Sequence, residues 1–335
     1  RLDAMVTAMQ VDDEPAAKVA GDFIAEQGLG YGLHTGPTKV VTVTVPQTQP
    51  ALPTTPPAVG PLRIAHAPLT DAQIAAHVYA GALQNAGIAV AIGDSQEPID
   101  ILAALSTGDV QFAPMRLYAI VNNLNISANG VLTLPIDGRD VNKMVATARD
   151  LARPRGITLL NPSTANVGSA WSVHKDFVAN TGITTLSELA RVSRQRPITV
   201  GGPPGCPERV WCKPFLEDRY GIKIGQFVPL DWGGGLTRAA IDRAEIDVGW
   251  LDGNDGGIEE FDFRVLKDDL GRESANPVTP VLNAASVTPE IAEVLNRVST
   301  VFTTDDPKNM NYAVELERRD LQEVVDEFLA AKGLD

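Results

Sequence analysis

The chain has 335 residues, of which 44% are apolar and only 5% aromatic, and its formal net charge is −14. This length suggests about two units of average domain size, with cores built mainly from Val, Leu, Ile and Ala. The negative charge argues against binding to nucleic acid or to an anionic membrane surface. The sequence has no apolar run near the roughly 18 residues of a membrane span and does not start like a signal peptide, so the chain is cytoplasmic, already processed or a fragment.

A helix is predicted over residues 2–29, because apolar residues recur at helical spacing and Gly28 provides a C-terminal stop. Its segment 18–29, KVAGDFIAEQGL, is similar to segment 323–334, EVVDEFLAAKGL. When residue 18 is aligned with residue 323, the apolar positions of the two copies superpose without a gap. We interpret this match as common origin; the alternative is two unrelated amphipathic helices that each end in Gly-Leu.

Residues 35–60 have a different composition, with seven Thr, six Pro and a single charged residue. Proline at this density prevents helix and favours an extended, semi-rigid chain. The stretch KVVTVTV within it has the pattern of one strand. We therefore predict a Thr/Pro-rich linker at 35–60, which is the strongest candidate domain boundary in the chain.

From Pro61 onward, short apolar runs alternate with helical patterns. Strands are predicted at 62–67, 88–93, 110–114, 157–160, 169–174, 197–202, 226–230, 246–251 and 263–267. Helices are predicted at 70–87 with Thr70 as N-cap, at 98–108, at 185–192 with a capping box from Thr185 to Glu188, at 235–245 and at 289–299. The alternation predicts an α/β architecture with parallel-rich sheets.

Cys206 and Cys212 are the two cysteines, and they lie in the Pro/Gly-rich stretch GGPPGCPERVWCKPF. Their proximity favours a small-loop disulfide and hence an oxidising compartment, and the alternative is two free buried thiols. A metal site is not expected, because the cysteine spacing is not C-x-x-C and the four histidines are scattered. No catalytic signature such as G-x-S-x-G, H-E-x-x-H or Walker A is present, so we predict neither an enzyme nor a cofactor.

Five loops rich in small, polar and Trp residues follow predicted strands, at 113–118, 161–171, 201–211, 230–237 and 251–257. The composition of each loop alone is explained by ordinary turn-forming residues. In an α/β fold, however, the loops at the carboxyl ends of strands are where ligands bind. Small residues let a ligand approach backbone N–H groups, and Trp supplies a flat apolar surface, so the five loops together predict a ligand site.

From about Leu62 to Leu334 the chain resembles the substrate-binding proteins of glycine betaine/choline/carnitine-type ABC importers, the osmoprotectant-binding family. The resemblance is carried by ITLLNPSTANVGSAWSV (157–173), by 220–251, by DGGIEEFDFRVLKDD (255–269) and by the C-terminal stretch 310–334. It implies a type II periplasmic-binding-protein fold, in which two lobes joined by a double-crossover hinge close over a ligand. Lobe 1 is expected at 61–163 and 256–335, and lobe 2 at 164–255. Residues 1–34 then resemble the tail of a second, upstream binding domain.

The resemblance also implies ligand-binding positions. Asn166 lies where the family places its crossover Asn, and Thr237 and Asp255 match further family positions. Two positions that hold Tyr in the family's aromatic box are Arg116 and Ser169 here, which predicts weak binding of a quaternary ammonium by that box. Arg116 is expected to favour a carboxylate, phosphate or hydroxyl-rich ligand instead. Other loops offer Trp211, Trp232 and Trp250 for a rebuilt cage, although Trp250 is equally well explained as core.

These observations predict an extracytoplasmic solute-binding protein without enzymatic activity, which captures a small polar or zwitterionic solute for an ABC permease. The alternative is a sensing or regulatory domain of the same fold that is not coupled to transport. The expected partners are the small-molecule ligand and the permease, with no nucleic acid and no direct insertion into a membrane.

Overall fold

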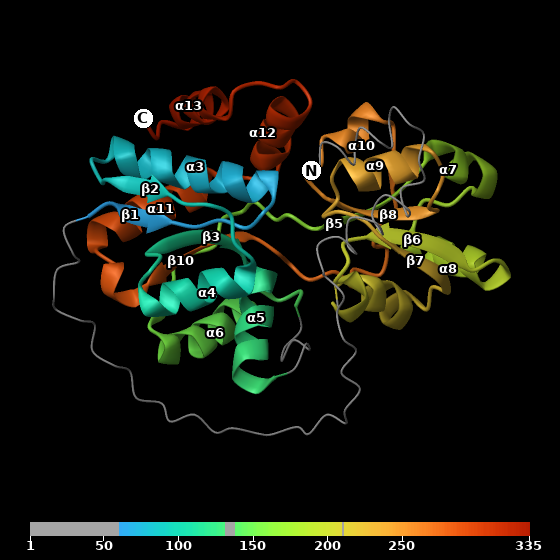
Figure 1. Ribbon diagram of the computed structural model, residues 1–335, viewed down its shortest axis with the longest axis horizontal. Helices are drawn as coiled ribbons and strands as arrows, with labels where there is room; N and C mark the ends of the chain where they lie inside the picture. Colours follow the sequence, from blue (N-terminus) through green and yellow to red (C-terminus); the bar gives the residue numbers. More distant parts are fainter. Residues whose placement is uncertain (1–59, 131–137, 210) are drawn as a thin grey trace, which may run out of the picture.

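A computed structural model describes residues 60–130, 138–209 and 211–335. In this part of the chain two α/β lobes lie next to each other, each built on one five-stranded sheet (Figure 1). The two-lobe α/β plan is the one predicted from the sequence. The helix predicted at 2–29, and all but the last residue of the linker at 35–60, lie outside the described residues.

The sheet of the first lobe has the strand order β2-β1-β3-β10-β4. Strands β1, β2 and β3 run parallel, whereas β10 runs antiparallel to both β3 and β4. The sheet is therefore mixed rather than parallel-rich, because β10 reaches it from the other lobe; the sequence pattern predicts no strand there. The bounds are β1 (Leu62–Ile64), β2 (Val90–Ile92), β3 (Phe112–Arg116), β4 (Ile157–Leu159) and β10 (Val278–Asn283).

The sheet of the second lobe has the order β7-β6-β8-β5-β9 and is also mixed. Strand β6 runs parallel to β7 and β8, and β5 runs antiparallel to β8 and β9. Strands β5 and β10 share a feature: each is antiparallel, and each is the first strand that the chain forms after it has crossed between the lobes. The bounds are β5 (Ser169–Val173), β6 (Ile198–Gly202), β7 (Ile224–Pro229), β8 (Val248–Asp252) and β9 (Arg264–Val265).

The chain crosses between the lobes from β4 to β5 and returns from β9 to β10. The two connections pair with each other, since Asn166 and Pro277 form an isolated antiparallel bridge and the Val167 N–H donates to the carbonyl of Asn276. This is the double-crossover hinge that was predicted. Two short extended segments held by a few hydrogen bonds are suited to bending when lobes open and close.

The return to the first lobe does not occur at residue 256, where it was expected. Strand β9 pairs with β5, and Phe263 is buried in the core of the second lobe. The second lobe extends through Asp269, because Leu266 is buried in its core, Lys267 forms a bridge with Thr185, and the Asp269 carboxylate accepts from the Ser187 N–H.

Helices cover both faces of the first sheet (Figure 1). Alternate residues of β3 serve two cores: Phe112 is buried on the α3 face and Ala113 on the α5 face. Helix α3 begins at Thr70 with Leu69 as its N-cap residue, so Thr70 does not cap it as predicted. One face carries α3 (Thr70–Asn85), α11 (Pro289–Val301), α12 (Asp305–Glu315) and α13 (Leu321–Lys332), and the other carries α4 (Pro98–Thr107), α5 (Leu117–Asn129) and α6 (Val141–Ala152).

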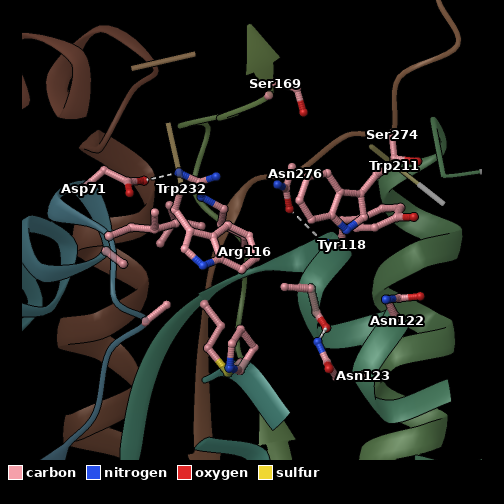
Figure 2. Close-up of a pocket in the computed structure, with 18 of the residues that line it drawn as sticks. Asp71, Arg116, Tyr118, Asn122, Asn123, Ser169, Trp211, Trp232, Ser274 and Asn276 are labelled. Atoms are coloured by element: carbon pink, nitrogen blue, oxygen red, sulfur yellow. Dashed lines mark hydrogen bonds and ion pairs between the residues drawn. The ribbon is translucent and has the colours of Figure 1, made fainter. Parts of the chain in front are cut away.

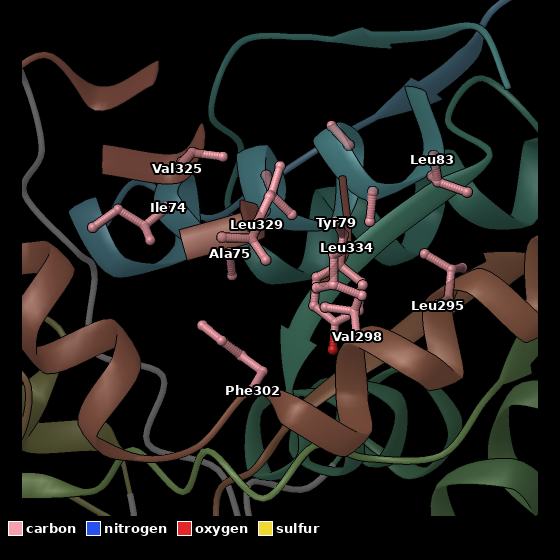
Figure 3. Close-up of a cluster of buried hydrophobic side chains, with 14 of the residues drawn as sticks. Ile74, Ala75, Tyr79, Leu83, Leu295, Val298, Phe302, Val325, Leu329 and Leu334 are labelled. Carbon is pink, nitrogen blue, oxygen red and sulfur yellow. The ribbon is translucent and has the colours of Figure 1, made fainter. Parts of the chain in front are cut away.

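The core on the α3 face joins the start of the domain to its C-terminal end (Figure 3). Helix α13 packs directly on α3, with Val325 and Leu329 fully or almost fully buried. A Cβ at Gly81 of α3 would lie 2.5 Å from Cδ1 of Leu329, so the two helices approach too closely for a larger residue at this position. The Tyr79 hydroxyl of α3 also forms a 2.9 Å hydrogen bond with Oγ of Ser299 in α11.

The second lobe carries α7 (Lys175–Thr181), α8 (Leu186–Gln195), α9 (Gly235–Asp242) and α10 (Gly257–Glu260). Helix α8 opens with the predicted capping box, in which Thr185 accepts from the Glu188 N–H and Glu188 accepts from the Thr185 N–H. Cys206 and Cys212 are disulfide-bonded, as expected, and both are fully buried in this lobe's core.

Candidate functional site

A pocket lies between the two lobes, where the end of β3 faces the end of β8 beside the hinge (Figure 2). Its volume is about 130 Å³. An apolar cavity of about 150 Å³ holds one benzene molecule, so this pocket suits a ligand with on the order of six to eight non-hydrogen atoms. Its charged and polar lining residues are Asp71, Arg116, Tyr118, Asn122, Asn123, Ser169, Arg209, Glu273, Ser274 and Asn276.

Arg116 is positioned at the junction of β3 and α5, where a loop was predicted over 113–118. Its Nη2 lies 2.5 Å from a carboxylate oxygen of Asp71 and 2.5 Å from one of Asp252. Asp71 belongs to α3 and Asp252 to the end of β8, so the arginine links the two lobes. Its charge is thus already compensated within the protein, which argues against the predicted role of Arg116 as the receptor of an anionic ligand.

Acidic groups outnumber cations around Arg116. Burial raises the pKa of Asp252 above its usual value, and the guanidinium of Arg116 opposes that rise. Glu273, from the return crossover, accepts a 2.5 Å hydrogen bond from the Ser169 N–H, and burial raises its pKa as well. Three carboxyl groups thus lie near one guanidinium on this side of the pocket, which gives a cationic ligand group acidic neighbours.

Trp211, Trp232 and Trp250 come together in one cluster that lines the pocket. Their ring centroids are separated by 6.2, 5.4 and 6.1 Å, which is the range of directly packed aromatic pairs. A trimethylammonium group has no room between rings packed in this way. The three indoles thus offer a ligand their outer faces rather than a rebuilt cage, and Trp250, which is only 3% exposed, serves both the core and the pocket wall.

Arg209 covers part of this aromatic surface. Its guanidinium carbon lies 4.8 Å from the ring centroid of Trp232 and 5.8 Å from that of Trp211, both within cation–π range. The sequence analysis did not name Arg209. A usable signal was present, because a cation two residues before a Trp in a predicted ligand loop is a candidate partner for that ring.

Three buried polar atoms of pocket-lining residues have no hydrogen-bond partner within the described part of the chain. They are Nε of Arg116, Nε1 of Trp250 and Oδ1 of Asn122. Buried polar groups are nearly always paired, so such atoms call for a partner. The donors come from both lobes, Arg116 from the first and Trp250 from the second, and these buried atoms mark polar groups within the pocket wall.

Of the predicted ligand residues, Arg116, Ser169, Trp211 and Trp232 line the pocket, whereas Asn166 does not. Oδ1 of Asn166 accepts a 2.6 Å hydrogen bond from the Asn276 N–H, which ties the two crossover segments together. Its observed contacts are thus those of a hinge residue. That the four lining residues touch a ligand stays a prediction.

Thr237 and Asp255 also lie outside the pocket lining. Thr237 is fully buried, and its Oγ1 donates a 2.7 Å hydrogen bond to Asp231, which shapes the loop before α9. Asp255 accepts from Nη1 of Arg238 at 3.0 Å, and burial raises its pKa to about 6. Arg238 also pairs with Glu315 of α12, so this cluster joins the two lobes without lining the pocket.

Several pocket residues lie outside the five predicted ligand loops, among them Asp71, Glu273 and Asn276, whereas Tyr118 lies in the predicted loop 113–118. Tyr118 and Asn276 are held together, since the Tyr118 N–H donates to Oδ1 of Asn276 at 3.0 Å (Figure 2). Glu273 and Asn276 lie on the return crossover, which the expected boundary at 256 had assigned to the interior of lobe 1. No local pattern marked Asp71, which follows the predicted cap Thr70.

Within residues 60–130, 138–209 and 211–335, no group of three or more His, Cys, Asp or Glu is arranged to hold a metal ion. No helix in the same part of the chain has the length and apolar character needed to cross a membrane.

Two α/β lobes, a double-crossover hinge and a ligand-sized pocket between the lobes define a two-lobe solute-binding protein. Residues 60–331 match the family described as the substrate binding domain of the ABC-type glycine betaine transport system, and the chain belongs to this family. Domains of this family bind small solutes and deliver them to an ABC permease. The resemblance inferred from the sequence is thereby confirmed.

Solved structures support the same fold. The chain is similar to a glycine betaine/carnitine/choline ABC transporter protein, with 20% identity, 82% of this chain and 99% of that chain covered, and a TM-score of 0.64. YehZ from Escherichia coli matches with 18% identity, coverage of 83% and 100%, and a TM-score of 0.60. A choline binding protein in complex with choline matches with 14% identity, coverage of 81% and 88%, and a TM-score of 0.57.

Proposed function

We propose that this protein is an extracytoplasmic receptor that captures a small zwitterionic or quaternary ammonium solute, such as glycine betaine or choline, and hands it to an ABC permease unchanged. The pocket between the lobes is the capture site. The family supports delivery to a permease, and one structural neighbour is described as a choline complex. The disulfide between Cys206 and Cys212 supports an oxidising, extracytoplasmic location.

The observation that carries this proposal is a ligand-sized pocket whose polar and aromatic wall is shared by both lobes. Arg116 and Asn122 belong to the first lobe and Trp250 to the second. A polar ligand that pairs with atoms from both lobes stabilises the closed arrangement more than the open one. Binding and closure are then the same event, as capture by a hinged receptor requires.

The pocket's charges support a ligand that is positive at one end. Asp71 and Glu273 line the pocket together with Arg116, Asp252 contacts the Arg116 guanidinium, and indole rings form a further part of the wall. We propose that Arg116, Ser169, Trp211 and Trp232 line the bound ligand. Asn166, Thr237 and Asp255 are assigned to the hinge and to the loops around the pocket instead.

Isothermal titration calorimetry of the purified protein with glycine betaine and choline tests the proposal. Ligands this small reach at most about −1.5 kcal/mol per non-hydrogen atom, so any dissociation constant weaker than about 1 nM is physically accessible to them. NMR of the recovered solute should show no chemical change. The proposal is wrong if neither solute gives saturable heat, or if either is converted.

For the domain organisation, we propose lobe 1 at 61–163 and 270–335, lobe 2 at 164–269, and residues 1–34 as the tail of a second binding domain attached through the linker at 35–60. The repeat supports the last point. Its C-terminal copy contributes Val324, Val325, Phe328 and Leu329 to the core, and the N-terminal copy is apolar at the same four positions.

Deletion of residues 1–59 tests this organisation. The remaining chain contains both sheets, the hinge and the pocket, so its melting temperature and ligand affinity should equal those of the full chain. If the shortened chain unfolds or loses binding, the N-terminal segment is part of this domain and the repeat reflects two unrelated helices.

A further inference from the structure

We propose that Arg209 is a specificity-determining residue that makes this pocket select a zwitterion over a purely cationic quaternary ammonium. The assignment rests on the proposed function, because it concerns the solute captured in the same pocket. Arg209 recognises the anionic end of the solute and, by occupying the indole faces, excludes a ligand that offers only a positive charge.

The first argument is that Arg209 is the pocket cation whose charge is uncompensated. Among the described residues, Arg209 forms no ion pair, and its contacts are with the rings of Trp211 and Trp232. Arg116, by contrast, is held by Asp71 and Asp252. A guanidinium in a pocket wall with free donors matches the geometry of a carboxylate, so an anionic ligand group pairs with Arg209 rather than with Arg116.

The second argument is that Arg209 occupies the aromatic surface. A ligand ammonium is bound by an indole when it lies within about 6 Å of the ring centroid, and the guanidinium carbon lies at 4.8 and 5.8 Å from two of the three rings. The three rings are packed against one another and leave no gap between them. A cation on those faces would therefore displace Arg209 or stand beside a like charge.

The third argument is that the pocket wall carries groups of both charges. Asp71 and Glu273 line the pocket together with Arg209, and burial raises the pKa of Glu273. A zwitterion satisfies both signs at once, with its ammonium towards the carboxylates and its carboxylate at Arg209. A cation such as choline satisfies the carboxylates but leaves the Arg209 guanidinium without a partner, which lowers its affinity.

Calorimetric titration with glycine betaine and choline tests the assignment, because the two probes share the trimethylammonium group and differ in the anionic end. The wild-type protein should bind glycine betaine at least tenfold more tightly than choline. Arg209→Gln should weaken glycine betaine at least tenfold and leave choline unchanged or tighter, so that the preference collapses. Arg209→Lys keeps the charge and should retain a preference for glycine betaine.

Arg196→Gln is the matched control, because Arg196 also lies over an aromatic ring, that of Phe177 at 5.9 Å, but does not line the pocket. It should leave both affinities unchanged, and melting curves confirm that each variant is folded. The assignment is overturned if wild-type protein prefers choline, or if Arg209→Gln weakens both probes equally or neither. Failure of both probes to bind wild type is a different result, which overturns the proposed function and this assignment with it.

Discussion

Replacing Arg116 by Met should destabilise the protein strongly at pH 8 and much less at pH 5. Asp71 and Asp252 are 5% and 7% exposed, and both carboxylates depend on this one guanidinium. Removing one partner of a buried ion pair costs about 3–5 kcal/mol, and here a single substitution leaves two carboxylates unpaired, which favours the upper end. For a chain of this size that corresponds to a fall in melting temperature of roughly 5–9 °C.

The pH dependence follows from the direction of the pKa shifts. Without Arg116 the folded-state pKa of Asp252 rises further above its unfolded value, because burial then acts unopposed. As the pH rises above about 4, Asp252 ionises first in the unfolded chain. The loss of folding free energy in the Arg116→Met variant therefore grows until the pH passes the folded-state pKa of Asp252. At pH 5 Asp252 is protonated in the folded variant, so most of this loss of stability is absent.

Differential scanning calorimetry at pH 5 and pH 8 measures both effects. Adding Asp252→Asn to Arg116→Met removes one of the unpaired charges and should restore about 1–3 kcal/mol. Arg153→Met is the control, since Arg153 pairs with Asp150 on the exposed surface and such pairs contribute about 0–1 kcal/mol. A loss below about 1 kcal/mol at pH 8, or an equal loss at both pH values, would refute the buried bridge.

Three further outcomes are expected. Thiol titration of the unfolded, unreduced protein should find no free thiol, and replacing Cys206 and Cys212 by Ser should lower the free energy of unfolding by about 2–3 kcal/mol in urea titrations. Tyr79→Phe should cost about 1–2 kcal/mol in the same titrations, because it leaves the buried Ser299 hydroxyl unpaired; unchanged stability would contradict this bond. Because burial raises the pKa of Asp255 to about 6, this group should reduce stability as the pH rises from about 4 to about 6, and Asp255→Asn should remove that slope from melting temperatures measured between pH 4 and 8.

Local features of this protein were predictable because the residues that form them are neighbours in the sequence. The capping box from Thr185 to Glu188 spans one helical turn, and the disulfide closes between cysteines six residues apart. The alternation of strands and helices follows from apolar periodicity, which reports which side chains face a core. Four of the predicted site residues line the pocket, since loops at strand ends converge at one edge of an α/β sheet.

Only the tertiary structure decided which charges meet. Arg116 was predicted to bind a ligand anion, but folding brings Asp71 and Asp252, which are 45 and 136 positions away, to its guanidinium. Strand β10 was missed for the same reason, because it becomes a strand through pairing with β3 and β4. The sequence by itself therefore determined the class of fold and the family. The charge pattern of the pocket, with Arg116 compensated and Arg209 over the indoles, depends on contacts between distant segments, and no local pattern encodes such contacts.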